Sequence, residues 1–141
     1  MTVSETTFSA TDLADGTYYF RVQAVDNVGN KGEWSTVSSV IVDTTAPGVA
    51  ANLRATNNAN VIALTWSAAL DSGVGVQKYN IQYSTSRDFI TISGSDTVSG
   101  TSCNIQNLSD GTYYFRVQAV DKNGNIGSWS NAASALVDGT A

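Results

Sequence analysis

The chain has 141 residues, of which 42% are hydrophobic and only 13% are charged, and its formal net charge is −5. The apolar share is sufficient for a packed core, whereas the acidic balance and the lack of a basic run exclude a nucleic-acid backbone as partner. No apolar stretch approaches the roughly 20 residues of a membrane span, so no membrane insertion is expected.

The first predicted elements lie in residues 1–46. Tyr18, Phe20, Val22 and Ala24 alternate with other residues within the segment DGTYYFRVQAVD at 15–26. Side chains two positions apart share one face of a strand, so these four are predicted to form an apolar face. A turn follows this strand, and a last strand precedes the junction at residues 43–48, which contains Pro47, the only proline.

Residues 47–141 carry the alternation and the turn signals of seven short strands and no helical periodicity, a pattern typical of an antiparallel sandwich. We expect the strands around Leu53, at 62–66, at 79–83, at 89–92, at 103–105, at 113–119 and at 133–137, with turns at 57–60, 93–96 and 123–124. In the strand at 113–119, Tyr113, Phe115 and Val117 share the inner face.

An internal repeat fixes the organisation. Residues 2–46 align without a gap on residues 97–141, an offset of 95, with 27 of the 45 positions identical. This period is too long for a solenoid repeat and fits a whole sandwich domain of about 100 residues. The sequence therefore predicts the C-terminal half of one domain at 1–46 and a complete domain at 47–141.

Three segments resemble the fibronectin type III family: Leu64-Thr65-Trp66, Tyr79-Asn80-Ile81-Gln82-Tyr83, and Leu108-Ser109-Asp110-Gly111-Thr112-Tyr113. The resemblance implies an immunoglobulin-like antiparallel β-sandwich, in which 1–46 corresponds to strands E, F and G. It also implies a tyrosine corner, for which the alternation favours Tyr113 over Tyr114. The core residues implied are Trp66, Tyr79, Tyr83, Leu108, Tyr113, Phe115 and Val117.

The half-repeat at 1–46 needs a cover for its apolar face. The complementary strands lie at 47–96, but residues 97–141 compete for them, and the five residues 44–48 reach only ~17 Å, less than the length of an eight-residue strand. We therefore expect the face of Tyr18, Phe20, Val22 and Ala24 to be a self-association face. Its expected partner is another copy of the chain, as a dimer or by strand exchange.

The sequence contains few candidate catalytic or metal-ligating residues. It contains no His, which removes the usual general base and the commonest metal ligand, so neither catalysis nor a cofactor is expected. Turn chemistry accounts for most acidic residues, and a calcium site involving Asp26, Asp43 or Asp121 is the minor alternative. Trp34 and Trp129 recur at one repeat position, either capping the core edge or stacking on a sugar. Cys103 is expected to be a buried, unpaired thiol.

These features favour a non-catalytic, extracellular or cell-surface module, acting as a spacer or adhesive repeat in a larger bacterial protein. Two alternatives stay open. One is an accessory module of a secreted polysaccharide-degrading enzyme, with a polysaccharide as possible partner. The other is a fibre subunit that assembles by exchange of half-domains.

Overall fold

The structure is a computed structural model that describes residues 1–139. The chain divides into two compact units, unit 1 (Met1–Thr44) and unit 2 (Thr45–Ala141), close to the predicted boundary after residue 46. Every regular element in the described range is a strand. In that range no helix has the length and hydropathy of a membrane span.

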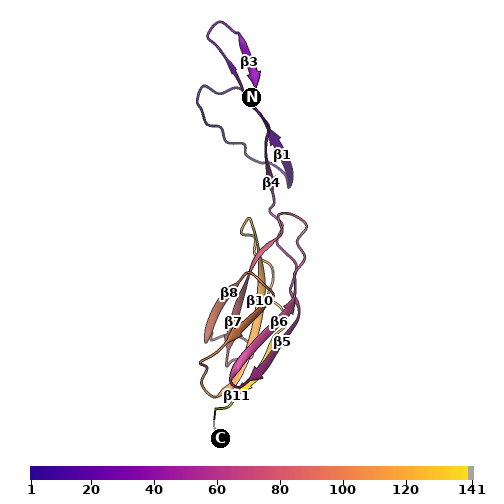
Figure 1. Ribbon diagram of the computed structural model, residues 1–141, viewed down its shortest axis with the longest axis vertical. Coiled ribbons are helices and arrows are strands. Elements are labelled where there is room, and N and C mark those ends of the chain that lie inside the picture. The colour runs from indigo at the N-terminus through magenta and orange to yellow at the C-terminus, as the bar shows by residue number, and fades with distance from the viewer. Residues whose placement is uncertain (140–141) are drawn as a thin grey trace. The chain divides into compact units, whose positions relative to one another are not determined.

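Unit 2 is a seven-stranded antiparallel sandwich, which confirms the predicted fold class. One sheet has the order β5 (Ala51–Asn58), β6 (Val61–Ser67) and β9 (Ser102–Ile105). The other has the order β11 (Ala133–Val137), β10 (Gly111–Asp121), β7 (Val76–Ser84) and β8 (Gly94–Val98). Figure 1 shows these strands in unit 2, with β5 and β6 on one side and β7, β8 and β10 on the other.

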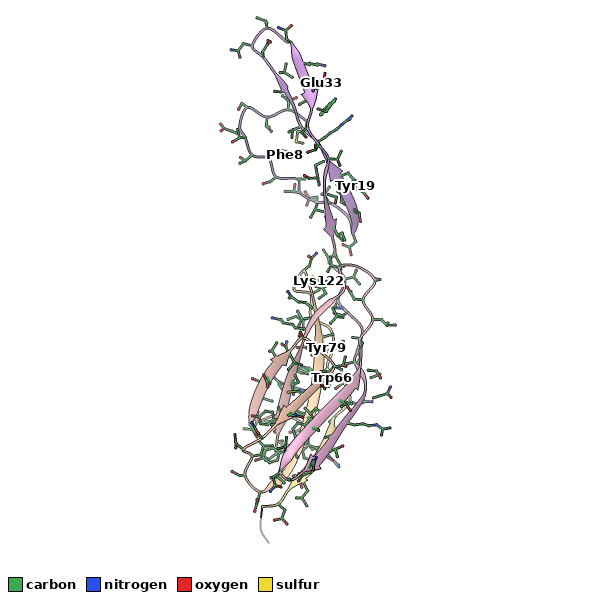
Figure 2. All side chains as sticks on the ribbon, in the orientation of Figure 1. Phe8, Tyr19, Glu33, Trp66, Tyr79 and Lys122 are labelled. Atoms are coloured by element: carbon green, nitrogen blue, oxygen red, sulfur yellow. The ribbon has the colours of Figure 1, made fainter. Side chains whose placement is uncertain are left out.

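The core of unit 2 lies between the two sheets, where the inward faces of β6, β7 and β10 meet. Strands with alternating apolar residues bury one face in this way because successive side chains point to opposite sides. Trp66 and Tyr79 make an edge-on ring contact, with centroids 5.4 Å apart, and both labelled side chains lie in the body of unit 2 (Figure 2). Of the predicted core residues, Trp66, Tyr79, Tyr113, Phe115 and Val117 are buried, and Tyr83 and Leu108 pack against this cluster while partly buried.

Three predicted elements in unit 2 are placed wrongly. Residues 89–92, expected to be a strand, form no strand, and residues 93–96, expected to be a turn, contain the start of β8. Likewise, β5 continues to Asn58, and the turn is confined to Ala59 and Asn60, both with positive φ (51° and 65°). Two consecutive positive φ values suit the tight hairpin turn that matches strand twist.

Unit 1 consists of two hairpin-like pairs. β1 (Gly16–Phe20) pairs with β4 (Ser38–Val42), and β2 (Gln23–Val25) pairs with β3 (Lys31–Trp34). The hydroxyl of Tyr18 donates a hydrogen bond to the carbonyl oxygen of Ala14 at 3.0 Å. Tyr18 stands at the repeat position of Tyr113, so this bond supports Tyr113, rather than Tyr114, as the corner position.

Candidate functional site: the outward face of β7, β8 and β10

An arginine held between two aromatic rings marks the outward face of the four-stranded sheet in unit 2. Arg116 lies in β10 on the face opposite Phe115 and Val117. Its guanidinium carbon is 4.3 Å from the ring centroid of Phe89 and 4.5 Å from that of Trp129. Its Nε and Nη2 also donate to Oε1 of Gln82 in β7, at 3.0 and 2.6 Å. Cation–π contacts with two rings and two hydrogen bonds together fix this side chain.

The same face carries a network of side-chain amides beside Trp129. Asn80 Nδ2 donates to Gln118 Oε1 at 3.3 Å, and Thr97 Oγ1 donates to Asn80 Oδ1 at 3.2 Å. Gln118 Nε2 donates to the carbonyl of Gly127 at 2.9 Å. Asn80, Thr97 and Gln118 line an open groove. The other lining residues come from β7, from β8 and from the segment before β11: Ile81, Gln82, Ser95, Asp96 and Trp129. Such a surface can offer hydrogen bonds and one aromatic ring to a neutral polar ligand.

The arginine–tryptophan contact recurs in unit 1. Arg21 lies 4.3 Å from the ring centroid of Trp34, and Gln23 Nε2 donates to the carbonyl of Gly32 at 2.8 Å. These residues occupy the repeat positions of the corresponding unit 2 residues. Both tryptophans therefore pack on an arginine of the same repeat, and the expectation that they cap the core edge stays a prediction. The offset of 95 between the two Arg–Trp pairs is the sequence signal that could have revealed this contact.

Asp26 and Asp121 open equivalent loops whose hydrogen bonds they organise. Oδ1 of Asp121 accepts from the amides of Asn123 and Asn125 at 2.8 and 2.9 Å, and its Oδ2 accepts from Asn125 Nδ2 at 2.7 Å. Asp26 makes the matching three bonds to residues 28 and 30. Both residues therefore have the turn chemistry that the sequence suggests.

The hydrogen bonds of these loops lower the pKa of both carboxyl groups. For Asp121, burial opposes ionisation, but the bonds from Asn125 and from the backbone amides outweigh it and hold the pKa below 3.8. For Asp26, the side chain of Asn30 is the largest cause of the lowered pKa. Both carboxylates are thus ionised near neutral pH.

The calcium prediction at Asp26, Asp43 and Asp121 stays a prediction. Asp26 and Asp43 lie at opposite ends of the β2–β4 segment of unit 1, Asp43 directly after β4. In unit 2, carboxylate oxygens of Asp71 and Asp121 lie within 4.8 Å of each other, and the amide of Gly75 donates to Asp71. Sequence reasoning missed Asp71, whose only signal was its place in a loop.

Cys103 in β9 is a buried thiol, and Asp96 is its neighbour. Its Sγ donates to Oδ2 of Asp96 at 3.6 Å. Burial is the main cause that raises the pKa of the thiol to about 11, and the adjacent carboxylate adds to it. A thiol with so high a pKa is a poor nucleophile at neutral pH.

The chain is similar to a known domain family and to segments of bacterial enzymes. The fibronectin type III domain model matches residues 45–135. Chitinase A1 of Niallia circulans is 35% identical over 94% of the chain and 19% of its own length, and exoglucanase B of Cellulomonas fimi is 36% identical over 91% and 12%. The chain thus spans less than a fifth of these relatives.

Solved structures agree with the family model. Chitinase ChiA74 from Bacillus thuringiensis is 30% identical, with a TM-score of 0.58 over 70% of this chain and 14% of that one. The sixth fibronectin type III domain of human fibronectin type III domain containing protein 3 has a TM-score of 0.57 at 22% identity, over 71% of this chain and 93% of that one. With the sheet order, the buried core and the family match in agreement, the chain belongs to the fibronectin type III domain family.

Proposed function

We propose that the chain is a non-catalytic, extracellular spacer module of a larger protein that degrades polysaccharide. The observation that supports this proposal is the set of similar proteins. They include a chitinase, two exoglucanases and an alpha-amylase, and the matched segment covers 9–19% of each. A segment of this size, shared among enzymes with different named substrates, fits a role other than the recognition of one substrate.

The fold is suited to a spacer because its strands run along one axis and its termini leave from different elements. In unit 2 the chain enters β5 (from Ala51) at one end of the sandwich and leaves β11 (to Val137) at the other end (Figure 1). A sandwich with a close-packed core holds its two ends at a fixed separation, unlike a Gly/Ser linker, which behaves as a random coil.

A sedimentation assay tests the spacer role. The purified chain is mixed with insoluble chitin, cellulose and starch, and both the bound protein and the released soluble sugar are measured. We expect no sugar release and no retention above that of bovine albumin. Sugar release by a homogeneous preparation would refute the non-catalytic assignment, and saturable retention would refute a pure spacer.

One observation favours a second candidate, a weak polysaccharide-contact surface. The groove beside Trp129 combines an aromatic ring with side-chain amides from β7 and β10, the two kinds of group that recognise neutral sugars. For this candidate, retention on one polysaccharide should fall at least about tenfold in Trp129→Ala. Trp34→Ala, at the equivalent repeat position, is the matched control and should keep full retention. Equal losses in both variants would contradict a site in the unit 2 groove.

A further inference from the structure

Two aspartates of unit 2, Asp71 and Asp121, bring carboxylate oxygens within 4.8 Å of each other. Asp71 lies in the loop between β6 and β7, and Asp121 is the last residue of β10. Asp121 pairs with Val76 at the start of β7, and the amide of Lys122 donates to the carbonyl oxygen of Gly75 at 3.1 Å. Backbone pairing therefore holds the two carboxylates side by side.

The loop fixes the carboxylate of Asp71 but leaves one of its oxygens without a partner. Oδ2 accepts a hydrogen bond from the amide of Gly75 at 2.6 Å, and Gly75 has a φ of 87°, a conformation that favours glycine. The other oxygen, Oδ1, is buried and accepts no hydrogen bond from the described part of the chain. A buried carboxylate oxygen without a donor costs free energy unless a cation neutralises it. Oδ1 of Asp71 is therefore the atom that points to a ligand.

Asp121 adds a second negative charge that is shielded from water. It is 0% exposed, and three hydrogen bonds from Asn123 and Asn125 hold its carboxylate in one orientation. An ionised carboxylate has about four acceptor positions, so these three bonds leave room for one further contact. Two carboxylates this close repel each other more strongly where water is excluded than at an open surface. The pair is therefore a site that a positive ion would stabilise.

Lys122 is near the loop but does not bond to the orphaned oxygen. Its Nζ is 3.9 Å from the position that a Cβ on Gly75 would take, and Lys122 is labelled in Figure 2. Oδ1 of Asp71 nevertheless accepts no hydrogen bond from it. An open groove of about 420 Å³ gives access to the loop, and its polar lining residues are Asp71, Tyr79, Ser99 and Thr101. A dissolved ion can therefore approach Asp71 from this groove.

We propose that unit 2 binds one Ca²⁺ between the carboxylates of Asp71 and Asp121, with Oδ1 of Asp71 as a ligand and water completing the coordination. Calcium lies about 2.3–2.6 Å from its oxygen ligands, so one ion can bridge two oxygens that are up to about 4.6–5.2 Å apart. Magnesium, at about 2.0–2.1 Å, bridges only about 4.0–4.2 Å and loses its water reluctantly. Zinc prefers Cys and His ligands, and the sequence contains no His. The site keeps Asp121 from the sequence-based calcium prediction and adds Asp71.

The test is a calcium titration of the full chain, freed of metal with a chelator and followed by NMR of the backbone amides. Added CaCl₂ should shift the amides of Gly75, Asn123 and Asn125 along one saturable curve. The expected dissociation constant is about 0.1–1 mM, the range of calcium sites in extracellular modules. MgCl₂ should bind at least about tenfold more weakly, because the two oxygens are too far apart for it.

Matched variants assign the calcium to this pair of carboxylates. Asp71→Asn removes the charge but keeps an oxygen that can accept from Gly75, so the calcium affinity should fall at least about tenfold in a chain that still folds. Asp121→Asn is a second variant with the same expected loss, and unchanged amide shifts in β6 and β7 report the fold of each. Asp26→Asn makes the same change in the equivalent loop of unit 1 and should leave the affinity unchanged.

Three results would overturn the inference. Shifts that rise linearly up to about 20 mM CaCl₂, without saturation, would indicate an adventitious ion only. Wild-type affinity in folded Asp71→Asn and Asp121→Asn would show that calcium binds elsewhere. Loss of binding in Asp26→Asn would place the site in unit 1.

Discussion

Comparison of Phe115→Ala with Phe20→Ala measures how much a buried aromatic side chain contributes to the free energy of unfolding of unit 2. Both sit in the sequence Tyr-Tyr-Phe-Arg-Val, so replacing either by Ala changes the local strand preference equally. Phe115 is fully buried in the core between the two sheets of unit 2, and removal of a fully buried Phe costs about 3–5 kcal/mol. Phe20→Ala should change the free energy of unfolding of unit 2 by less than about 0.5 kcal/mol, since it removes nothing from that core.

The assay is urea unfolding followed by tryptophan fluorescence. In a background with Trp34→Phe and Trp129→Phe, the signal comes from Trp66, which is buried in unit 2. With a denaturant dependence of about 2 kcal/mol per M, Phe115→Ala should lower the unfolding midpoint by about 1.5–2.5 M. The reasoning fails if Phe115→Ala shifts the midpoint by less than about 0.5 M, or if Phe20→Ala shifts it as far as Phe115→Ala does.

Three further predictions concern single positions in unit 2. A Cβ at Gly127 would stand 2.5 Å from the carbonyl oxygen of Pro47, so Gly127→Ala should destabilise unit 2 by about 1–3 kcal/mol in the same urea assay. Gly100→Ala in unit 2, with no atom within 4 Å of the added Cβ, is the matched control and should cost less than about 1 kcal/mol; equal costs would refute the steric argument. Because the pKa of Asp121 is lowered, its stabilising effect is full above the ordinary value of 3.8 and is lost as pH falls through the lowered pKa. An NMR titration should therefore place the carboxyl midpoint below 3.8, and a midpoint above 3.8 would contradict the loop geometry. Burial raises the pKa of Cys103 from 9.0 to about 11, so at pH 8 this residue should hold about a hundredfold less thiolate than an unperturbed thiol. It should therefore react with a disulfide reagent about a hundredfold more slowly. Fast reaction without denaturant would contradict the burial of the thiol.

The strands with regular alternation could be predicted from the sequence because burial on one face imposes period 2. The segment 113–119 shows this best, since the buried residues of β10 are the ones that the alternation places inward. β8 could not be predicted in the same way. Its Gly94-Ser95-Asp96 sequence is typical of a turn, and it forms a strand because β7 pairs with it. A Cβ at Gly94 would stand 2.2 Å from the Tyr83 hydroxyl, so the aromatic ring of the neighbouring strand lies on this glycine.

The candidate surface was harder to predict than the fold because its residues come together only across strands. Phe89 follows β7, Arg116 lies in β10 and Trp129 precedes β11, and no local pattern links the first to the others. Phe89 also has a positive φ of 56°, which is rare for a bulky residue and turns its segment away from the predicted strand. Of these three residues, only Arg116 and Trp129 could be linked from the sequence, because the pair recurs in unit 1 as Arg21 and Trp34.

The tyrosine corner, the aspartate loop and the Arg–Trp contact all form within residues 1–44 without the other half of the domain. A C-terminal half with so many local contacts has consequences for synthesis on the ribosome. Residues 47–96 emerge when the related half at 1–46 is complete, whereas their proper partner at 97–141 needs a further 45 residues, about 2–9 s of elongation. During that interval the short connector at 44–48 is the main barrier to mispairing with the preceding half. Lengthening it with a flexible insert should therefore lower the yield of correctly folded chain.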